Sequence, residues 1–215
     1  MNDSTNMVSV DGCALARLAD VAAAVTDRSR TGPIYASHVH LWAHDGHLHM
    51  DTTGRHRMAS GRVPQTHPQA DGLDILLPVD VLRSARWYLD VLLRDYAVTA
   101  SVLHADGQAI ITLTTDTGAS VTVSGRTGDM SQWPDLDQVW AGITPTADPQ
   151  PVTWDARLAA PLIEAMGGWV TIWHASSSTT VMTTWDGSVI AALMPMVSDG
   201  PRDVWPGLLA SGEES

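Results

Sequence analysis

The sequence has 215 residues and contains neither lysine nor phenylalanine, and Cys13 is its single cysteine. One cysteine excludes an intrachain disulfide framework and a zinc site built from several thiolates. No apolar run approaches the roughly 20 residues that are needed to cross a bilayer. Residues 1–6 lack both the basic and the apolar region of a signal peptide. We therefore expect a cytoplasmic protein.

Positive charge is scarce, because 12 arginines face 24 acidic residues and the net charge is −12. This balance argues against a basic protein that wraps nucleic acid, so any DNA contact must be local. With 44% hydrophobic and 17% charged residues, the chain is long enough for one large or two small domains around a buried core.

One order of elements occurs three times: a short strand, an amphipathic helix, and then strands joined by tight turns. In the first unit, a strand at 7–10 precedes a helix capped by Asp11, and strands follow at 34–43, 47–52 and 57–63. The Asp45-Gly46 pair predicts a type I′ hairpin between two of these strands.

The second and third units repeat this order. A strand at 73–77 and a helix to about residue 94 precede strands at 98–104, 109–115 and 119–124. In the third unit, a strand at 151–154 and a helix from Asp155 to Met166 precede strands at 169–174, 179–185 and 188–196. Pro161 is expected to kink or shorten that last helix.

The three units predict an α+β fold with antiparallel sheets and helices on one face. Two units placed side by side cover each other's sheet edges, so the natural domain holds a pair. We expect a complete two-unit domain at 1–130, a connecting loop or linker at 131–150, a single half domain at 151–198 and a tail at 199–215.

These units resemble the domains of the bacterial DNA polymerase III β subunit family, the β sliding clamps. Three stretches carry the resemblance. Residues 53–59 (TGRHRMA) are similar to the family's TDGHRLA, residues 128–135 (GDMSQWPD) to its loop ending in FPD, and residues 193–196 (LMPM) to its C-terminal VMPM. Gly54 and Arg55 depart from the family's Asp-Gly pair, Trp133 replaces Phe, and Val197 replaces the Arg that follows the last motif.

The alignment covers about residues 7–197 and leaves half a domain and the family's first domain without a counterpart. The chain is therefore similar to a shortened member of the family, of the kind that a phage, a plasmid or an actinobacterium would encode.

In the family, the three stretches form an apolar cleft that receives short linear peptides from polymerases and other replication proteins. The resemblance implies a cleft lined by Thr53, His56, Arg57, Met58, Pro134, Val139, Leu193, Met194, Pro195 and Met196. Methionine and proline give a deformable apolar surface that suits related peptides. The alternative is that residues 194–196 are the end of an ordinary core strand.

A clamp also faces duplex DNA with its helices, where positive charge meets phosphates without base-specific contacts. The resemblance implies that the arginines on or just after the three helices contact DNA. These are Arg17, Arg28, Arg30, Arg83, Arg86, Arg94 and Arg157. The alternative is an ordinary solvated helix face.

Histidines alternate along the two strands of the predicted hairpin. If Asp45-Gly46 forms a two-residue turn, His44 pairs with His47, and five imidazoles project from one face together with Trp42. They belong to His38, His40, His44, His47 and His49. Such a cluster binds zinc or nickel only where ring nitrogens converge, and we favour a surface role over a metal site.

Motifs of catalysis are absent from the sequence, which has no glycine-rich phosphate loop, nucleophile elbow or zinc-protease motif. Asp135 and Asp137 form a carboxylate pair, but such a pair beside Pro134 is more often solvated. We expect no enzyme activity and no cofactor.

The sequence thus predicts a homo-oligomeric, sliding-clamp-like processivity factor of DNA replication, which binds partner peptides and non-specific duplex DNA. One alternative is a ringless peptide-binding adaptor or decoy of the replication machinery, and a second is a histidine-rich metal protein.

Overall fold

The computed structural model describes residues 7–26, 33–67, 71–144, 146, 154–175 and 179–194. Its strands are β1 (Met7–Asp11), β2 (His38–His44), β3 (His47–Thr53), β4 (Arg57–Pro64), β5 (Asp74–Pro78), β6 (Val98–Ala105), β7 (Gln108–Thr115), β8 (Ser120–Arg126), β9 (Val170–His174), β10 (Thr180–Thr184) and β11 (Val189–Leu193). Its helices are α1 (Gly12–Val25), α2 (Val79–Leu92), α3 (Leu136–Ala141) and α4 (Ala156–Met166), with short 3₁₀ turns at Ile34–Ala36 and Met130–Gln132.

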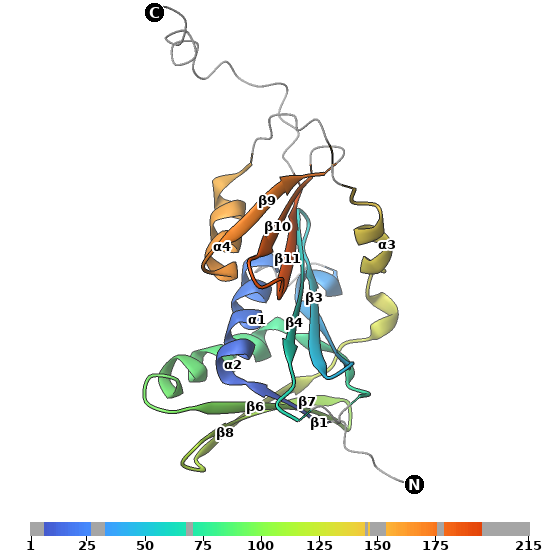
Figure 1. The fold of residues 1–215 in the computed structure, drawn as a ribbon. Coiled ribbons are helices and arrows are strands. Elements are labelled where there is room, and N and C mark those ends of the chain that lie inside the picture. Colours follow the sequence, from blue (N-terminus) through green and yellow to red (C-terminus); the bar gives the residue numbers. More distant parts are fainter. Residues whose placement is uncertain are drawn as a thin grey trace, which may run out of the picture.

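The strands form two antiparallel sheets (Figure 1). The first two units exchange their opening strands, because β1 pairs with β6 of the second unit and β5 pairs with β2 of the first unit. This exchange gives a four-stranded sheet in the order β1-β6-β7-β8. The third unit joins through β11, which pairs with β4, and the second sheet therefore has seven strands in the order β5-β2-β3-β4-β11-β10-β9.

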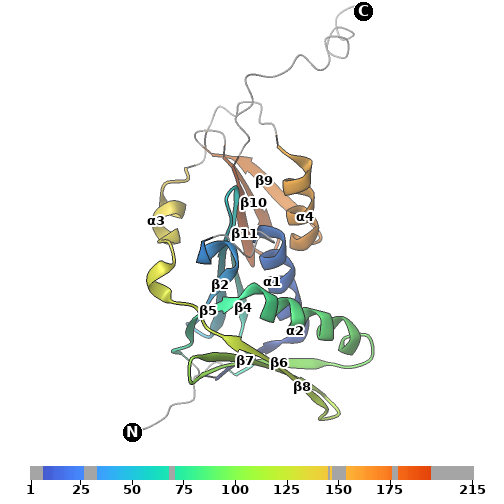
Figure 2. The same ribbon diagram turned by 180° about the vertical axis from the view of Figure 1, so that it is seen from behind.

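Helices α1, α2 and α4 lie on one side of the sheets, where α1 packs against both other helices. The fit is close at Gly61 of β4, because a Cβ atom there would lie 2.6 Å from Leu18 Cδ2 of α1. Helix α3 lies on the other side of the seven-stranded sheet, as the opposite views of Figures 1 and 2 show. We call these two sides the helix face and the outer face.

The predicted α+β class, with antiparallel sheets and repeated strand-helix-strands units, is confirmed. The hairpin turns are confirmed as well: both residues of Asp45-Gly46 have positive φ, 49° and 70°, as a type I′ turn requires. Asp106-Gly107 repeats this geometry with 52° and 69°.

Two local features differ from expectation. Pro161 does not shorten helix α4, which runs through it to Met166, since a proline removes only one backbone hydrogen bond and Pro161 lies on the exposed side of α4. The segment 131–150 contains helix α3, and this helix departs from the expectation that all helices share one face. The strand expected at 151–154 falls mostly outside the described residues, and Trp154 itself is not in a strand.

None of the described helices combines the length and the apolar character that a membrane span requires.

Candidate functional site

The pairing of β4 with β11 brings together two stretches that are far apart in the sequence. Met58 lies opposite both Thr53 of β3 and Ala192 of β11. Beyond the end of β11, the backbone N–H of Met194 donates to the carbonyl oxygen of His56 at 2.9 Å. The stretches 53–59 and 192–194 therefore form one continuous piece of sheet.

Side chains on this piece of sheet alternate between the two faces. Met58, Ala192 and Met194 share the outer face, and Met194 is 44% exposed. Arg57 and Leu193 lie opposite each other and point to the helix face, where Leu193 is part of the buried core. Leu193 was expected to line the cleft. This expectation was wrong, because successive side chains of a strand point to opposite faces and Leu193 therefore points away from the outer face.

Helix α3 carries the third stretch over the outer face. The indole N–H of Trp140 donates to Ser60 Oγ at 2.9 Å, and Ser60 is two positions beyond Met58 on β4. The carboxylate of Asp135 accepts from the backbone N–H of Gln138 and starts the helix directly after Pro134. Val139 is 38% exposed on α3. Pro195 and Met196, also expected in the cleft, lie outside the described residues.

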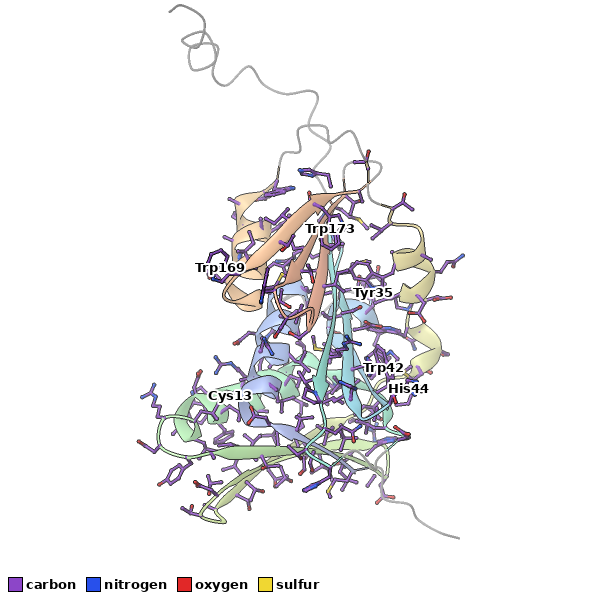
Figure 3. The ribbon with its side chains drawn as sticks, in the orientation of Figure 1. Cys13, Tyr35, Trp42, His44, Trp169 and Trp173 are labelled. Atoms are coloured by element: carbon purple, nitrogen blue, oxygen red, sulfur yellow. The ribbon has the colours of Figure 1, made fainter. Side chains whose placement is uncertain are left out.

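A trough runs along the outer face beside α3, and we call it the outer trough. Its apolar half is a pocket of about 280 Å³, lined by Ser60, Trp140, Ile143, Trp173, Val181 and Ile190. Its polar half is a pocket of about 250 Å³, which shares Ser60 and Ile190 and adds Trp42, His49, Asp51, Gly61, Arg62, Asp137, Gly187 and Ser188. Figure 3 shows Trp42 and Trp173 at separate places along this side of the sheet.

Asp51 is the buried acid of the polar half. It is 7% exposed and accepts a hydrogen bond from the hydroxyl of Ser60. Burial raises the pKa of Asp51, because a carboxylate loses its hydration there; the Ser60 hydrogen bond and nearby His40 act in the opposite direction, and Asp137 adds to the rise. The trough therefore holds an acid that gains a proton more easily than an exposed aspartate.

Sequence reasoning missed the apolar residues of the trough, which come from four different elements and the loop after α3. The resemblance identified only the three motif stretches, and Trp173, Val181 and Ile190 lie outside those stretches. The alternation of side chains along β9, β10 and β11 shows which residues share the outer face, but only once the order of the strands in the sheet is known.

The histidine face agrees with its predicted register, since His44 lies opposite His47 and Trp42 opposite His49. The rings stack on each other: the centroid of Trp42 is 4.5 Å from that of His40 and 5.1 Å from that of His49. His40 Nε2 also contacts Asp74 Oδ1 at 2.7 Å. Burial lowers the pKa of His38 and of His49.

No group of three His, Cys, Asp or Glu side chains converges as a metal site among the described residues. The metal hypothesis for His38, His40, His44, His47 and His49 is thus not supported there. Stacking on Trp42 spreads the rings along the face of the sheet, and a bound metal would need them to converge.

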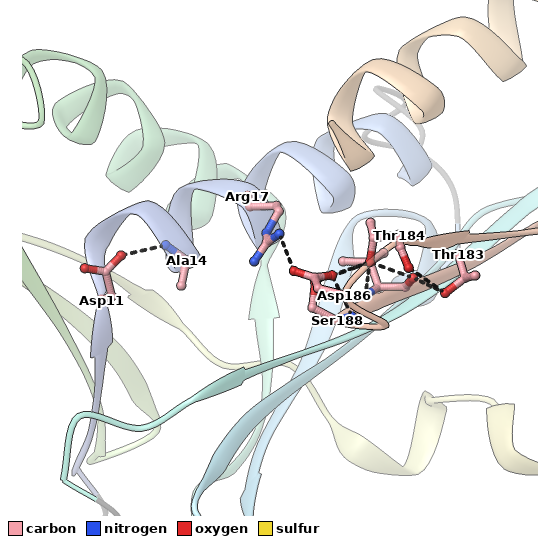
Figure 4. Close-up of polar contacts among 8 residues, drawn as sticks. Asp11, Ala14, Arg17, Thr183, Thr184, Asp186 and Ser188 are labelled. Carbon is pink, nitrogen blue, oxygen red and sulfur yellow. Dashed lines mark hydrogen bonds and ion pairs between the residues drawn. The ribbon is translucent and has the colours of Figure 1, made fainter. Parts of the chain in front are cut away.

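The helix face is balanced in charge. Arg17 pairs with Asp186 at 3.0 Å, as Figure 4 shows. The other ion pairs are Arg83 with Asp80 at 3.1 Å, Arg86 with Asp20 at 2.8 Å and also with Asp90, and Arg157 with Asp155 at 2.7 Å. Arg28 and Arg30, expected to contact DNA, lie outside the described residues.

Arg94 differs from these arginines, because no ion pair is found for it within the described part of the chain. It lines a groove of about 560 Å³ between α1, α2 and α4, together with Arg17 and Arg86 and with Asp20, Asp90 and Glu164. The groove therefore has as many acidic as basic side chains.

Solved structures with this arrangement of sheets and helices exist. A β sliding clamp from C. crescentus matches with a TM-score of 0.69 and 15% identity over 92% of this chain and 68% of that chain. The chain has the fold of a bacterial DNA sliding clamp. A putative DNA polymerase III β subunit from Eubacterium rectale (TM-score 0.69, 8% identity, 88% and 64% covered) and a sliding clamp from Pseudomonas aeruginosa (0.66, 14%, 91% and 67%) share this clamp fold.

The chain spans about two thirds of the length of these clamps, from 64% to 68%. Neither a protein-family model nor a curated protein matches its sequence. The clamp fold is thus preserved here at an identity of 8% to 15%.

Proposed function

We propose that this chain is a non-catalytic, clamp-like accessory protein of DNA replication. It binds a short linear peptide of a polymerase or another replication protein along the outer face, in the outer trough and over Met58 and Met194, and acts in the cytoplasm. The observation that carries the proposal is the junction of β4 with β11, where Met58, Ala192 and Met194 share the face on which Trp140 anchors α3.

The two halves of the trough fit the two parts of an amphipathic peptide. Trp140, Trp173 and Ile143 offer aromatic and aliphatic contacts for apolar side chains. Arg62 in the polar half offers a charge-assisted hydrogen bond to a carboxylate of the peptide. A short linear peptide usually binds with micromolar affinity, which corresponds to a binding free energy of about −8 kcal/mol.

The test is fluorescence anisotropy with a labelled clamp-binding peptide of a bacterial polymerase. We expect Met194→Ala to weaken binding at least fivefold, since Met194 is 44% exposed on the outer face. Met58→Ala combined with Met194→Ala should weaken it further; Met58 is buried, so circular dichroism must first show that this variant folds. Val91→Ala is the matched control, because Val91 is an exposed apolar residue of α2 on the helix face. Equal affinity of Met194→Ala and the wild type for the peptide would reject the site.

Contact with duplex DNA is the second part of the proposal, with Arg94 and the paired arginines Arg17, Arg83, Arg86 and Arg157 as candidates. Each paired arginine must leave or share its carboxylate to bind a phosphate, so we expect weak binding that decreases steeply with salt. Retention on closed circular DNA, lost when the circle is cut, would support an oligomeric ring around DNA.

A ringless adaptor is the competing function, and the ion pairs of the helix face favour it. The two functions differ in one measurement: both bind the peptide, but only a ring remains on closed circular DNA. Asp20→Asn combined with Asp90→Asn frees Arg86 and should increase DNA retention if the helix face meets phosphates. No change in retention would favour the adaptor.

A further inference from the structure

Two tryptophans at one end of the third unit are almost fully exposed to solvent. Trp169 lies between the end of α4 and the start of β9, and Trp185 directly follows β10. Their exposed fractions are 84% and 85%, whereas Trp87, the next most exposed tryptophan of the described residues, is 62% exposed. Large apolar side chains that stay in water at one place of a surface are typical of an interaction site.

The backbone holds these two tryptophans side by side. Val170 lies opposite Thr184 in the pairing of β9 with β10, so Trp169 lies opposite Trp185 one position further along. The backbone N–H of Trp185 donates to the carbonyl oxygen of Trp169 at 3.1 Å and extends the ladder to this pair. Opposite residues of an antiparallel ladder point to the same face. The two indoles therefore leave the sheet end on the same side.

A space remains between the two indoles. A cavity of about 410 Å³ is lined by Trp169 and Trp185 alone, and no contact between their rings is found among the described residues. Their neighbours in sequence do not fill this space, because Gly168 and Gly187 carry no side chain and a Cβ atom on either would meet nothing within 4 Å. We call this space the tryptophan cleft.

The charge around the tryptophan cleft decides between possible ligands. An adjoining pocket of about 380 Å³ brings Arg17 and Asp186 next to both tryptophans. These two side chains pair with each other at 3.0 Å (Figure 4), so they leave no net positive charge for a phosphate. The net charge of the chain, −12, repels polyanions and attracts cations. A cation is also attracted by the negative face of an aromatic ring, and an indole binds it best.

We propose that the tryptophan cleft binds the arginine side chain of a basic segment of a partner protein. A guanidinium group is flat, weakly hydrated and always charged, so it stacks on aromatic faces more readily than a lysine ammonium does. The rings of Trp169 and Trp185 offer two such faces across one cleft. Neither tryptophan lines the outer trough, so this segment and the peptide of the proposed function occupy different sites.

Fluorine NMR of the full chain tests the proposal. The nine tryptophans are labelled as 5-fluorotryptophan, and single Trp→Phe variants assign their resonances. The probe is a short capped peptide with two arginines between glycines. We expect the resonances of Trp169 and Trp185 to shift and to saturate together, while the resonance of Trp87 does not move.

Two comparisons separate a stacked cation from other kinds of contact. A peptide with citrulline in place of arginine keeps the flat shape without the charge, and we expect it to bind at least roughly fivefold more weakly. Trp169→Leu keeps an apolar side chain but removes the aromatic face, so it should weaken binding of the arginine peptide to a similar extent. Trp87→Leu is the matched control at an exposed tryptophan of α2 and should leave the affinity unchanged.

Equal affinities for the arginine and citrulline peptides, or an unchanged affinity of Trp169→Leu, would overturn the proposal. Saturating shifts of Trp169 and Trp185 with a single-stranded oligonucleotide would assign the cleft to a nucleic acid instead. Shifts that depend on protein concentration alone would assign it to a second copy, and either result also overturns the proposal. Met194→Ala should leave binding of the arginine peptide unchanged, so this test can fail without affecting the proposed function.

Discussion

The indole N–H of Trp140 donates a hydrogen bond to the hydroxyl oxygen of Ser60 at 2.9 Å, although 80 positions separate the two residues in the chain. This bond joins α3 to the centre of the seven-stranded sheet. Ser60 in turn donates to Asp51, so helix, strand and buried acid form one chain of hydrogen bonds. These two hydrogen bonds hold α3 in place as one wall of the outer trough.

Trp140→Phe removes the donor and keeps most of the ring. We expect the free energy of unfolding to decrease by about 1 kcal/mol, the usual value of one hydrogen bond. Hydrogen exchange of residues 136–141 should become faster, while exchange in β4 changes little. Trp133→Phe is the control, because no hydrogen bond of its indole is found among the described residues. Unchanged exchange of α3 in Trp140→Phe would show that other contacts hold this helix.

Asp51→Asn should change how stability depends on pH. Burial raises the pKa of Asp51 above the ordinary value of 3.8, so the folded protein holds this proton more tightly than the unfolded chain. The contribution of Asp51 is most favourable at acid pH and is lost as pH rises through the folded pKa.

Asparagine stays neutral and keeps an oxygen that accepts from Ser60. Urea unfolding between about pH 4 and pH 8 should therefore show a smaller decrease in stability with rising pH for Asp51→Asn than for the wild type. Asp137→Asn is the control for the neighbouring acid. Parallel pH profiles of Asp51→Asn and the wild type would contradict the assignment.

Asp186 organises the turn between β10 and β11. Its carboxylate accepts from the hydroxyl and the backbone N–H of Ser188, from the hydroxyl of Thr184 and from Arg17 (Figure 4). These donors, the Ser188 hydroxyl first, lower the pKa of Asp186 well below its usual range.

Because the folded pKa is lowered, the stability that Asp186 contributes is present at neutral pH and is lost as pH falls below about 4. We expect Asp186→Ala to destabilise more than Arg17→Ala, since an exposed ion pair alone contributes only about 0–1 kcal/mol. Chemical denaturation at pH 7 and pH 3 checks both statements: the effect of Asp186→Ala should be smaller at pH 3. Equal effects of the two substitutions at pH 7 would contradict the role of the turn.

Gly61→Ala tests the packing of α1 on β4. The added methyl group would meet Leu18 Cδ2 at 2.6 Å, and Leu18 is fully buried. We expect a loss of about 1–3 kcal/mol, the usual cost of overpacking a core. The control is Gly142→Ala, where the nearest atom lies 3.4 Å away and φ is −79°. A thermal midpoint for Gly61→Ala equal to that of the control would show that the core yields at this point.

Local rules predicted the hairpins, helices and strand faces of each unit. The alternation of Val39 and Leu41 with His38 and His40 fixed the register of β2, because a slip by one residue would bury the histidines. The order of the sheets could not be predicted in the same way. The pairing of β4 with β11 depends on contacts across the whole chain, and neither strand encodes its neighbour.

The sequence motifs predicted which stretches of chain form the candidate site. They did not predict which face of the sheet each side chain of a stretch points to. Met58 and Met194 lie on the outer face together, but Leu193 between them in space points to the core. Trp140 became part of the site through a short helix of six residues that carried no strong periodic signal.

The place of β11 in the middle of the large sheet has a consequence for biosynthesis. Ser60 pairs with Ile190, so 190 − 60 = 130 residues must be translated before the edge of β4 is covered. At elongation speeds of about 5–20 residues per second this takes on the order of ten seconds, far longer than local hairpins need to form. The nascent chain thus exposes the unpaired edge of β4, to which other strands can pair wrongly. We expect the yield of folded protein in the cell to depend on chaperones that shield this edge until translation ends.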